Sequence, residues 1–369
     1  MNSARDALAR RCAELIDRLS DGTVDEAARD ALLGDLARHQ LAHVAPWRRL
    51  AEARGVDVRE RIDLATLPAL PTDVFRHARV AVHPPEQDVR VFRTSGTSQA
   101  IRGVHPLRDL SLYDRAARAA ARTALFPDVD RAHLVVLAPP EGEAPDSSLA
   151  YMLARFAEWF GLGATDWIWR EGHLDVDALE GTLRAATEAR HPVALLGTSF
   201  AFVHAEDALG PRDARFALPE GSRVMHTGGF KGRSREVAPD ALRDLIAARY
   251  GLPPSHVVVE YGMTELSSQM YEPVPTAPIA PEAGPPGPLW VPGWVRATPV
   301  DPDTLAPVAE GEVGVLRIDD VANLDTPCCI QTADLARRHG DRLEVLGRAP
   351  GAGPRGCSLA VDAALGGAP

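Results

Sequence analysis

Five consecutive residues combine hydroxyl side chains with a glycine: Thr94, Ser95, Gly96, Thr97 and Ser98. Hydroxyl groups and backbone amides can hold the oxygens of a triphosphate, and a glycine lets the backbone approach them. The loop is not a Walker loop, because no Gly-Lys-Ser/Thr follows it. The alternative is a serine- and threonine-rich turn that caps a helix.

A second segment, downstream, contains Tyr261, Gly262, Met263, Thr264 and Glu265. Tyr261 offers a ring face for a purine, Thr264 a hydroxyl near phosphates, and Glu265 a hard oxygen ligand for Mg²⁺. The alternative is a strand end whose glutamate caps the next helix. Together the two segments predict a nucleotide site.

The cationic residues are unevenly divided. The chain has 40 basic residues, and Lys231 is the only lysine. Lys231 either remains by chance or marks a site that requires a compact ammonium where a planar guanidinium will not serve.

Composition excludes several classes of function. A formal net charge of -11 argues against nucleic-acid and anionic-membrane surfaces, both of which favour a basic face. No apolar run approaches the roughly 20 residues of a membrane span. The cysteines, Cys12, Cys328, Cys329 and Cys357, have neither metal-ligand spacing nor a disulfide framework, which indicates reduced thiols in a cytoplasm.

Strands and helices must alternate to position these residues. We expect strands at 89–92, 133–138, 193–197, 223–225 and 256–260, and helices at 107–125, 148–160, 176–190 and 240–250. This alternation predicts an α/β fold with a mainly parallel sheet and flanking helices. Ligands in such sheets bind beyond the carboxyl ends of the strands, and both segments follow strands.

The length of 369 residues suggests about two domains. We expect an N-terminal helical segment over 1–75, a core over 76–290, and a small β-rich lobe over 291–369 that ends in a flexible, cysteine-bearing segment. The lobe contributes strands at 312–318 and 343–346. Residues 273–293 are rich in proline and glycine, and we expect an ordered loop there because Trp290 and Trp294 favour burial.

From about residue 75 onward, the chain resembles the adenylate-forming (ANL) superfamily. It is most similar to the LuxE-type acyl-protein synthetases, with the phenylacetate-CoA ligases as relatives. The resemblance implies ATP- and Mg²⁺-dependent conversion of a carboxylic acid to acyl-AMP. It also implies that the hydroxyl loop grips pyrophosphate, and that Tyr261 to Glu265 hold adenine, the α-phosphate and Mg²⁺.

Two downstream residues also match the family. Residues 331–335 resemble its Thr-Gly-Asp motif, with alanine in place of glycine, and the resemblance implies that Asp334 binds the ribose hydroxyls. Gly347-Arg348 resembles the following hinge, where the arginine contacts ribose or phosphate. The alternatives are a helix-start Asp334 and a solvated Arg348.

The larger family members continue into a mobile C-terminal domain with a catalytic lysine, and we expect that domain to be absent here. Lys231 is then the substitute cation that holds the substrate carboxylate against the α-phosphate. It follows an expected strand and the glycines Gly228 and Gly229, so it should emerge near the ligand edge. The alternative is an exposed loop lysine.

Cys357 lies in a segment that resembles the C-terminal cysteine segment of acyl-protein synthetases, where a thiol takes the acyl group from the adenylate. The neighbouring Arg355 would lower the pKa of the thiol, and Gly351, Gly353 and Gly356 would let the segment swing. The alternative is a small buried hydrophobe. Cys328 and Cys329 are interpreted as strand packing.

The acyl pocket is expected beside Thr198, Ser199 and Phe200, with Gly228 and Gly229 nearby. His226 would line it or simply satisfy a sheet edge. The predicted function is activation of a carboxylic acid, with a fatty acid as the expected substrate, and transfer of the acyl group through Cys357 to a reductase or carrier protein. The alternatives are direct transfer to CoA or to an amine, and a degenerate subunit that only binds nucleotide.

Overall fold

The computed structural model describes residues 2–58, 62–95, 101–228, 237–276, 287–349 and 355–366, with the backbone alone at 2–3 and 355–359. The chain divides into two compact units. The first unit comprises Met1–Ala120, Met263–Gln269 and Trp290–Pro369, and the second comprises Ala121–Gly262 and Met270–Leu289. The three-part division expected from the sequence stays a prediction. None of the described helices is long and apolar enough to cross a membrane.

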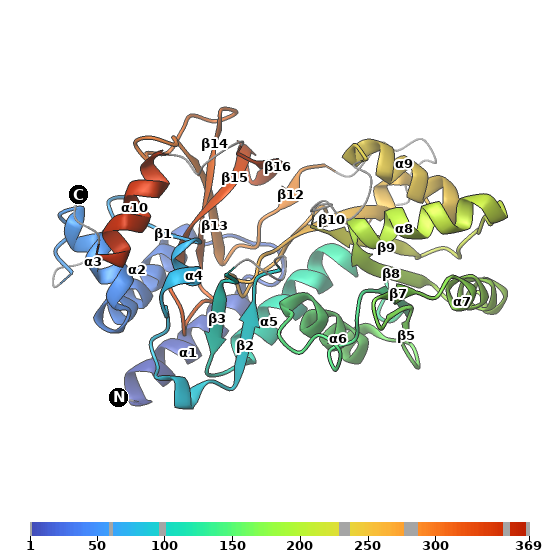
Figure 1. Ribbon diagram of the computed structural model, residues 1–369, viewed down its shortest axis with the longest axis horizontal. Coiled ribbons are helices and arrows are strands. Elements are labelled where there is room, and N and C mark those ends of the chain that lie inside the picture. Colours follow the sequence, from blue (N-terminus) through green and yellow to red (C-terminus); the bar gives the residue numbers. More distant parts are fainter. Residues whose placement is uncertain are drawn as a thin grey trace. The chain divides into compact units, whose positions relative to one another are not determined.

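The second unit is built on a mainly parallel sheet, as the sequence predicts (Figure 1). The strand order is β5 (Asp166–Trp167), β4 (His133–Leu137), β8 (Val193–Thr198), β9 (Arg223–Thr227), β10 (Val257–Tyr261) and β11 (Met270–Tyr271). Neighbours from β5 to β10 pair in parallel, and β11 pairs antiparallel with β10. A Cβ at Gly197 would stand 2.8 Å from the Leu137 carbonyl oxygen, so only glycine permits this approach of β8 to β4.

The helices of the second unit are α6 (Ser148–Phe160), α7 (Val176–Ala189), α8 (Ser199–Leu209) and α9 (Pro239–Tyr250). Helices α7, α8 and α9 share one apolar core with the sheet, which includes Leu183, Phe202 and Ile246. Figure 1 shows α6 on the opposite side of these strands from α8 and α9. Burial of each such leucine, isoleucine or phenylalanine stabilises the fold by about 1.5–3 kcal/mol. This core therefore holds the strands, and the residues at their ends, in place. The short strands β6 (Trp169–Arg170) and β7 (His173–Leu174) form a separate hairpin.

The first unit combines helices with an antiparallel sheet. Its helices are α1 (Asn2–Arg18), α2 (Glu26–His43), α3 (Ala45–Ala53), α4 (Val74–His77), α5 (Ser111–Ala120) and α10 (Arg355–Leu365). Strands β13 (Val295–Val300), β14 (Val313–Asp320), β15 (Cys329–His339) and β16 (Arg342–Arg348) pair in sequence order. Strand β1 (Leu70–Pro71) pairs in parallel with β15, and β2 (Arg90–Arg93) and β3 (Val104–Leu107) form a hairpin. Strand β12 is Leu289–Trp290.

Two differences from the expected elements have physical causes. The helix expected over 107–125 begins at Ser111, because Leu107 belongs to β3, and a π-turn at Ala121–Leu125 follows α5. The segment expected to be flexible contains helix α10, in which alanine and leucine favour helix despite the preceding glycines. Asp334 lies within β15, not at a helix start. Trp290 and Trp294 are buried, as predicted.

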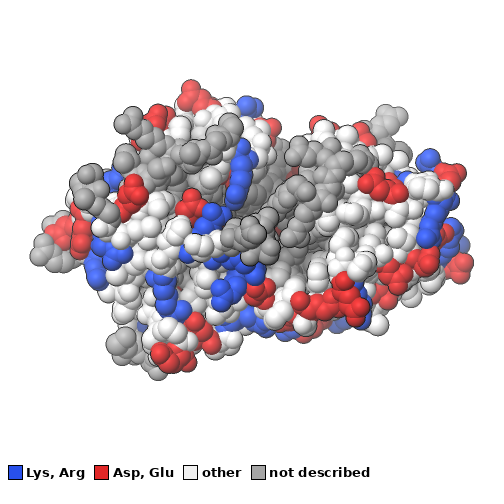
Figure 2. All heavy atoms as spheres, in the orientation of Figure 1, with Lys and Arg blue, Asp and Glu red and all other residues white. Residues whose placement is uncertain are grey.

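On the face shown in Figure 2, acidic and basic side chains are interspersed over each unit. Many exposed charges of the chain pair with a neighbour, as Arg115 does with Asp17 and Arg212 with Asp177. Exposed pairs of this kind contribute only about 0–1 kcal/mol each, so the fold depends on its apolar cores and buried polar contacts.

Candidate functional site

The β2–β3 hairpin of the first unit holds Thr94, the first residue of the hydroxyl loop. The Thr94 amide donates to the Gly103 carbonyl at 3.0 Å, and the Gly103 amide donates to Thr94 Oγ1 at 2.8 Å. Arg102 Nε donates to the Thr94 carbonyl at 2.6 Å. Ser95 is exposed, while Gly96, Thr97 and Ser98 lie outside the described residues. The predicted phosphate cradle therefore begins at a fixed threonine.

Thr94 and Glu265 meet at Gly103, although 170 residues separate them in the chain. A Cβ at Gly103 would stand 3.0 Å from Thr94 Cγ2, 3.5 Å from Thr94 Oγ1 and 3.5 Å from Glu265 Oε1. A Cβ here would press on Thr94 Cγ2, whereas its distance from Glu265 would be that of an ordinary contact. The two segments that the sequence analysis singled out thus converge in the first unit through Thr94 and Glu265.

Glu265 is buried without enough positive charge to balance it. Burial raises the pKa of Glu265 to about 7, although the guanidinium groups of Arg76 and Arg348 lower it. A carboxylate in this state fits a divalent cation, which would restore the ionised form. Among the described residues no three His, Cys, Asp or Glu side chains gather as a metal cage.

Asp334 and Arg348 face each other on adjacent strands. They are register partners of β15 and β16, and Arg348 Nε lies 3.6 Å from Asp334 Oδ1. The Arg348 side chain is 73% exposed and that of Asp334 15%, so the guanidinium is accessible to a ligand. Both charges act on Glu265, since Arg348 lowers its pKa and Asp334 raises it. The structure therefore brings Thr94, Glu265, Asp334 and Arg348 together.

His105 on β3 links the two segments, and sequence reasoning missed it. Its Nδ1 contacts the Thr264 carbonyl and its Nε2 lies 2.9 Å from Thr326 Oγ1. A carbonyl can only accept, so Nδ1 carries the proton and Nε2 accepts from the Thr326 hydroxyl. Burial lowers the pKa of His105 to about 4, which keeps the ring neutral and this tautomer fixed.

The end of β14 and the loop that follows it hold the backbone of the Glu265 segment. Asn323 Nδ2 donates to the Glu265 carbonyl at 2.9 Å, and its Oδ1 accepts from the Ser267 amide at 2.8 Å. Asp320 accepts from the Ser268 amide and hydroxyl at 2.9 and 2.7 Å. Gln40 of α2 binds this loop in turn, donating to the Asn323 carbonyl at 2.6 Å. These long-range contacts preorganise Glu265.

The second unit contains the residues expected at the acyl pocket. Ser199 Oγ lies 2.9 Å from His226 Nδ1 and 2.7 Å from the Gly228 carbonyl. The hydroxyl proton must go to that carbonyl, so His226 Nδ1 is the donor to Ser199. Burial, with Arg243 as a second cause, lowers the pKa of His226 to about 3. Within the described part of the chain, His226 Nε2 has no partner and is buried.

The structure gives fewer contacts for the other residues predicted for the site. Thr198 accepts from the Ala201 amide at 3.2 Å and so caps α8, and the Phe200 ring lies 5.5 Å from that of Trp169. Tyr261 and Gly262 belong to the second unit, whereas Thr264 and Glu265 belong to the first.

Lys231 and Gly229 lie outside the described residues. Cys357 is described only by its backbone in α10.

The remaining cysteines are buried and unpaired. Cys12, Cys328 and Cys329 are free thiols with no exposed surface. Burial raises the pKa of Cys12 to about 12 and holds that of Cys328 well above its usual range. Because the thiolate is the nucleophile, Cys12 and Cys328 are inert. The burial of Cys328 and Cys329 at the start of β15 agrees with the predicted strand packing.

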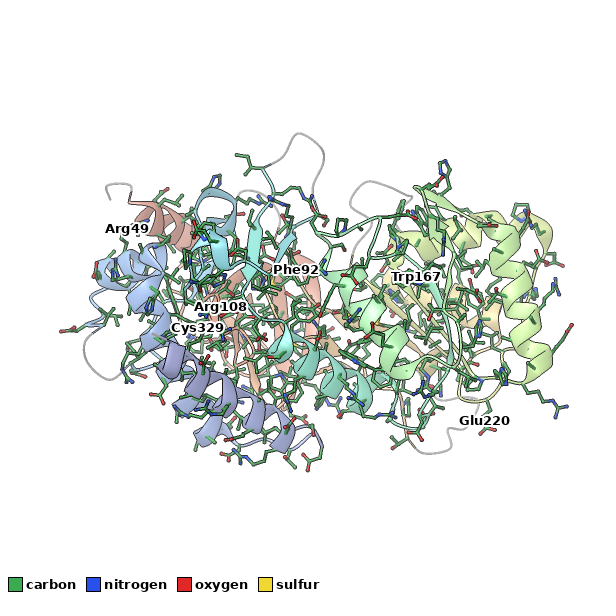
Figure 3. The ribbon with its side chains drawn as sticks, turned by 90° about the horizontal axis from the view of Figure 1, so that it is seen from below. Arg49, Phe92, Arg108, Trp167, Glu220 and Cys329 are labelled. Carbon is green, nitrogen blue, oxygen red and sulfur yellow. The ribbon has the colours of Figure 1, made fainter. Side chains whose placement is uncertain are left out.

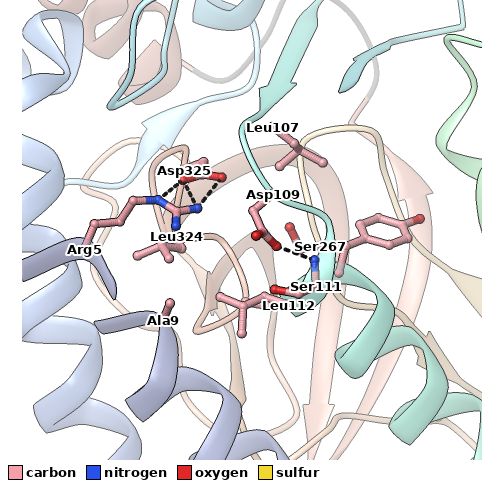
Figure 4. Close-up of a pocket in the computed structure, with 11 residues that line it drawn as sticks. Arg5, Ala9, Leu107, Asp109, Ser111, Leu112, Ser267, Leu324 and Asp325 are labelled. Carbon is pink, nitrogen blue, oxygen red and sulfur yellow. Dashed lines mark hydrogen bonds and ion pairs between the residues drawn. The ribbon is translucent and has the colours of Figure 1, made fainter. Parts of the chain in front are cut away.

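A small cavity of the first unit lies beside α1 and α5 (Figure 4). Its volume is about 30 Å³, enough for ordered water but not for an organic substrate. Arg5 crosses its wall and donates to both carboxylate oxygens of Asp325, at 2.8 and 2.9 Å. This ion pair at the cavity wall fastens α1 to the loop that carries Asp325.

Substitution of Gly103 by alanine tests the convergence. The new Cβ would stand 3.0 Å from Thr94 Cγ2 and 3.5 Å from Glu265 Oε1, which forces Thr94 to shift. We expect ATP–pyrophosphate exchange to fall by at least about 10-fold, because misplaced catalytic groups lose rate steeply. Gly142→Ala is the matched control, since no atom lies within 4 Å of its Cβ position. Equal rates for both variants would contradict the arrangement.

The family model described as "Acyl-protein synthetase, LuxE" matches residues 18–366. The chain belongs to this family. The long-chain-fatty-acid–luciferin-component ligases of Vibrio harveyi and Aliivibrio fischeri are 33% and 34% identical to it over 82 and 80 residues. These alignments cover 20% and 19% of this chain and 22% and 21% of the relatives. The matched region thus spans about a fifth of the curated relatives' length.

Solved structures show the same fold. A 2-hydroxyisobutyryl-CoA ligase in complex with 2-HIB-AMP and CoA has a TM-score of 0.63 at 15% identity, over 90% of this chain and 78% of that chain. MatB from Rhodopseudomonas palustris with bound ATP has a TM-score of 0.50 at 16% identity, over 72% of this chain and 49% of that chain. The fold class that the sequence predicts is confirmed for this LuxE-family chain.

Proposed function

We propose that this LuxE-family chain is an adenylate-forming ligase, which activates a fatty acid with ATP and transfers the acyl group to its own Cys357. The observation that carries the proposal is the meeting of Thr94 and Glu265 at Gly103. The raised pKa of that buried carboxylate supports a cation site. Asp334 and Arg348 lie within its electrostatic reach, as a bound nucleotide would require.

The proposed nucleotide contacts follow the two segments. The hydroxyl loop grips pyrophosphate as it leaves, Tyr261 stacks on adenine, and Asp334 and Arg348 bind ribose and phosphate. Thr264 and Gly262 approach the α-phosphate. Glu265 would hold Mg²⁺, which when bound offsets the negative charge of the phosphates. The acyl pocket is assigned to Thr198, Ser199, Phe200, His226, Gly228 and Gly229.

The proposed reaction has two steps, adenylation of the acid and transfer of the acyl group to Cys357. A carboxylate oxygen of the acid attacks the α-phosphorus and pyrophosphate leaves, which gives acyl-AMP. The Cys357 thiolate then attacks the acyl carbonyl carbon and AMP leaves, which gives a thioester. A reductase or carrier protein in the cytoplasm is the proposed acceptor. The printed name of the Vibrio harveyi relative, a long-chain-fatty-acid ligase, supports a fatty acid as the substrate.

Substitution of Glu265 by glutamine should weaken Mg²⁺-dependent turnover by about 100-fold, because a ligand of the cation is lost. The pKa of about 7 adds a pH dependence. Mg²⁺ binds the ionised carboxylate, so its apparent affinity should fall about tenfold per pH unit below 7. The amide introduced by Glu265→Gln has no such proton to lose. Mg²⁺ titrations of pyrophosphate exchange at pH 6, 7 and 8 measure both effects, and identical titrations for both proteins would refute the role of Glu265.

Exchange of labelled pyrophosphate into ATP, measured with saturated fatty acids of increasing length and with aryl acids, tests the activity itself. We expect exchange that depends on a fatty acid and on Mg²⁺. ATP binding without exchange by any acid would instead indicate a subunit that only binds nucleotide.

A further inference from the structure

Helix α10, which carries Cys357, is docked on the N-terminal part of the first unit. It lies against α3 and also contacts α4 and β1 (Figure 1). Ala360 and Ala364, one helical turn apart, are 1% and 0% exposed. Small side chains at this spacing bring two helix backbones close together. Helix α10 therefore packs in a defined position against α3, α4 and β1.

Arg49 of α3 binds the C-terminal end of α10 (Figure 3). Its Nε donates to the Ala364 carbonyl at 2.9 Å, and a Cβ at Gly366 would stand 3.7 Å from the same nitrogen. The last carbonyls of a helix lack partners within the helix. A guanidinium there supplies a hydrogen bond and a charge that the helix dipole favours.

Two of the elements that α10 contacts adjoin the candidate site. Helix α4 contacts α10, and its Arg76 lowers the pKa of Glu265. Strand β1 pairs with β15 through Leu70 and Ile330, and β15 carries Asp334. Helix α10 thus rests on one element whose arginine acts on Glu265 and on another that pairs with the strand of Asp334.

We propose that this docked position of α10 is the one in which Cys357 receives the acyl group, with α3 as its dock and Arg49 as a positioning residue. The inference rests on the proposed function. As the sulfur–carbon bond forms, the bond from the acyl carbon to AMP breaks, AMP takes the electron pair, and the thiol proton passes to solvent. In our proposal, docking of α10 raises the effective concentration of the thiol at the adenylate. The N-terminal helices thereby gain a role in transfer.

Two variants that weaken the dock test the proposal, each with a matched control. Arg49→Ala removes the bond to the Ala364 carbonyl, and Arg48→Ala removes a neighbouring charge from the same helix. Ala364→Glu places a carboxylate in the buried contact, and Leu365→Glu places it on the exposed side of α10. We expect self-acylation to slow about 5- to 10-fold in Arg49→Ala and more in Ala364→Glu.

Intact-protein mass against time measures self-acylation, and pyrophosphate exchange in the same samples measures adenylation. Exchange should be unchanged in all four variants, which also shows that they fold. Self-acylation at the wild-type rate, or faster, in both Arg49→Ala and Ala364→Glu would overturn the dock. A wild-type protein without exchange would refute the proposed function instead.

Discussion

Substitution of Lys231 by alanine should abolish adenylation, with pyrophosphate exchange falling about 1,000-fold. Both the substrate carboxylate and the triphosphate are anionic, and the attack brings them together. Removal of a group that stabilises such charge typically costs about 100- to 1,000-fold in rate. The described cations near Glu265 are Arg76 and Arg348, and Arg348 is largely exposed. Lys231, the single lysine of the chain, lies three residues beyond Gly228, which follows β9.

The controls separate the ammonium from charge in general. Lys231→Arg keeps the charge but changes the geometry, so it should recover little activity. Arg235→Ala removes a cation from the same segment of the sequence and should leave exchange near the wild-type rate. Normal exchange by Lys231→Ala would show that our assignment of this residue is wrong.

Substitution of Cys357 by alanine should leave pyrophosphate exchange intact and eliminate covalent acylation. The physical reason is that adenylation needs no thiol, whereas thioester formation needs a thiolate. Intact-protein mass after incubation with ATP, Mg²⁺ and fatty acid measures the loss.

Cys12→Ala is the matched control for Cys357→Ala. Cys12 is buried and its pKa is raised to about 12, so it cannot be the acceptor. Acylation that survives in Cys357→Ala would move the acceptor role to another residue. AMP release that depends on CoA in the same variant would favour a CoA ligase.

The sequence predicts elements best where local pattern and packing agree. Helix α6 was expected over its observed residues because its apolar residues share one face, and β8 and β10 were expected from their apolar runs. Strand β3 was missed because His105 and Pro106 interrupt its pattern. The glycines before α10 predict a flexible segment, but the alanines and leucines of residues 359–365 favour a helix.

The sequence predicts which residues form the candidate site, but not which residues hold them in position. The two segments pointed to Thr94 and Glu265, and the glycines Gly96 and Gly103 to a close approach of the backbone to phosphate, yet no local pattern predicts that Thr94 and Glu265 meet at Gly103. His105 and Asn323 hold the Glu265 segment through contacts across 159 and 58 residues of sequence. Side chains that act over such separations leave no local pattern, so only the folded structure reveals them.

The most direct test of the account is the intact mass of the wild-type protein after incubation with ATP, Mg²⁺ and a pool of fatty and aryl acids. The account predicts a mass increase equal to one fatty acyl group, labile to hydroxylamine and located at Cys357. ATP consumption without any mass increase would contradict self-acylation and indicate transfer to a soluble acceptor such as CoA or an amine.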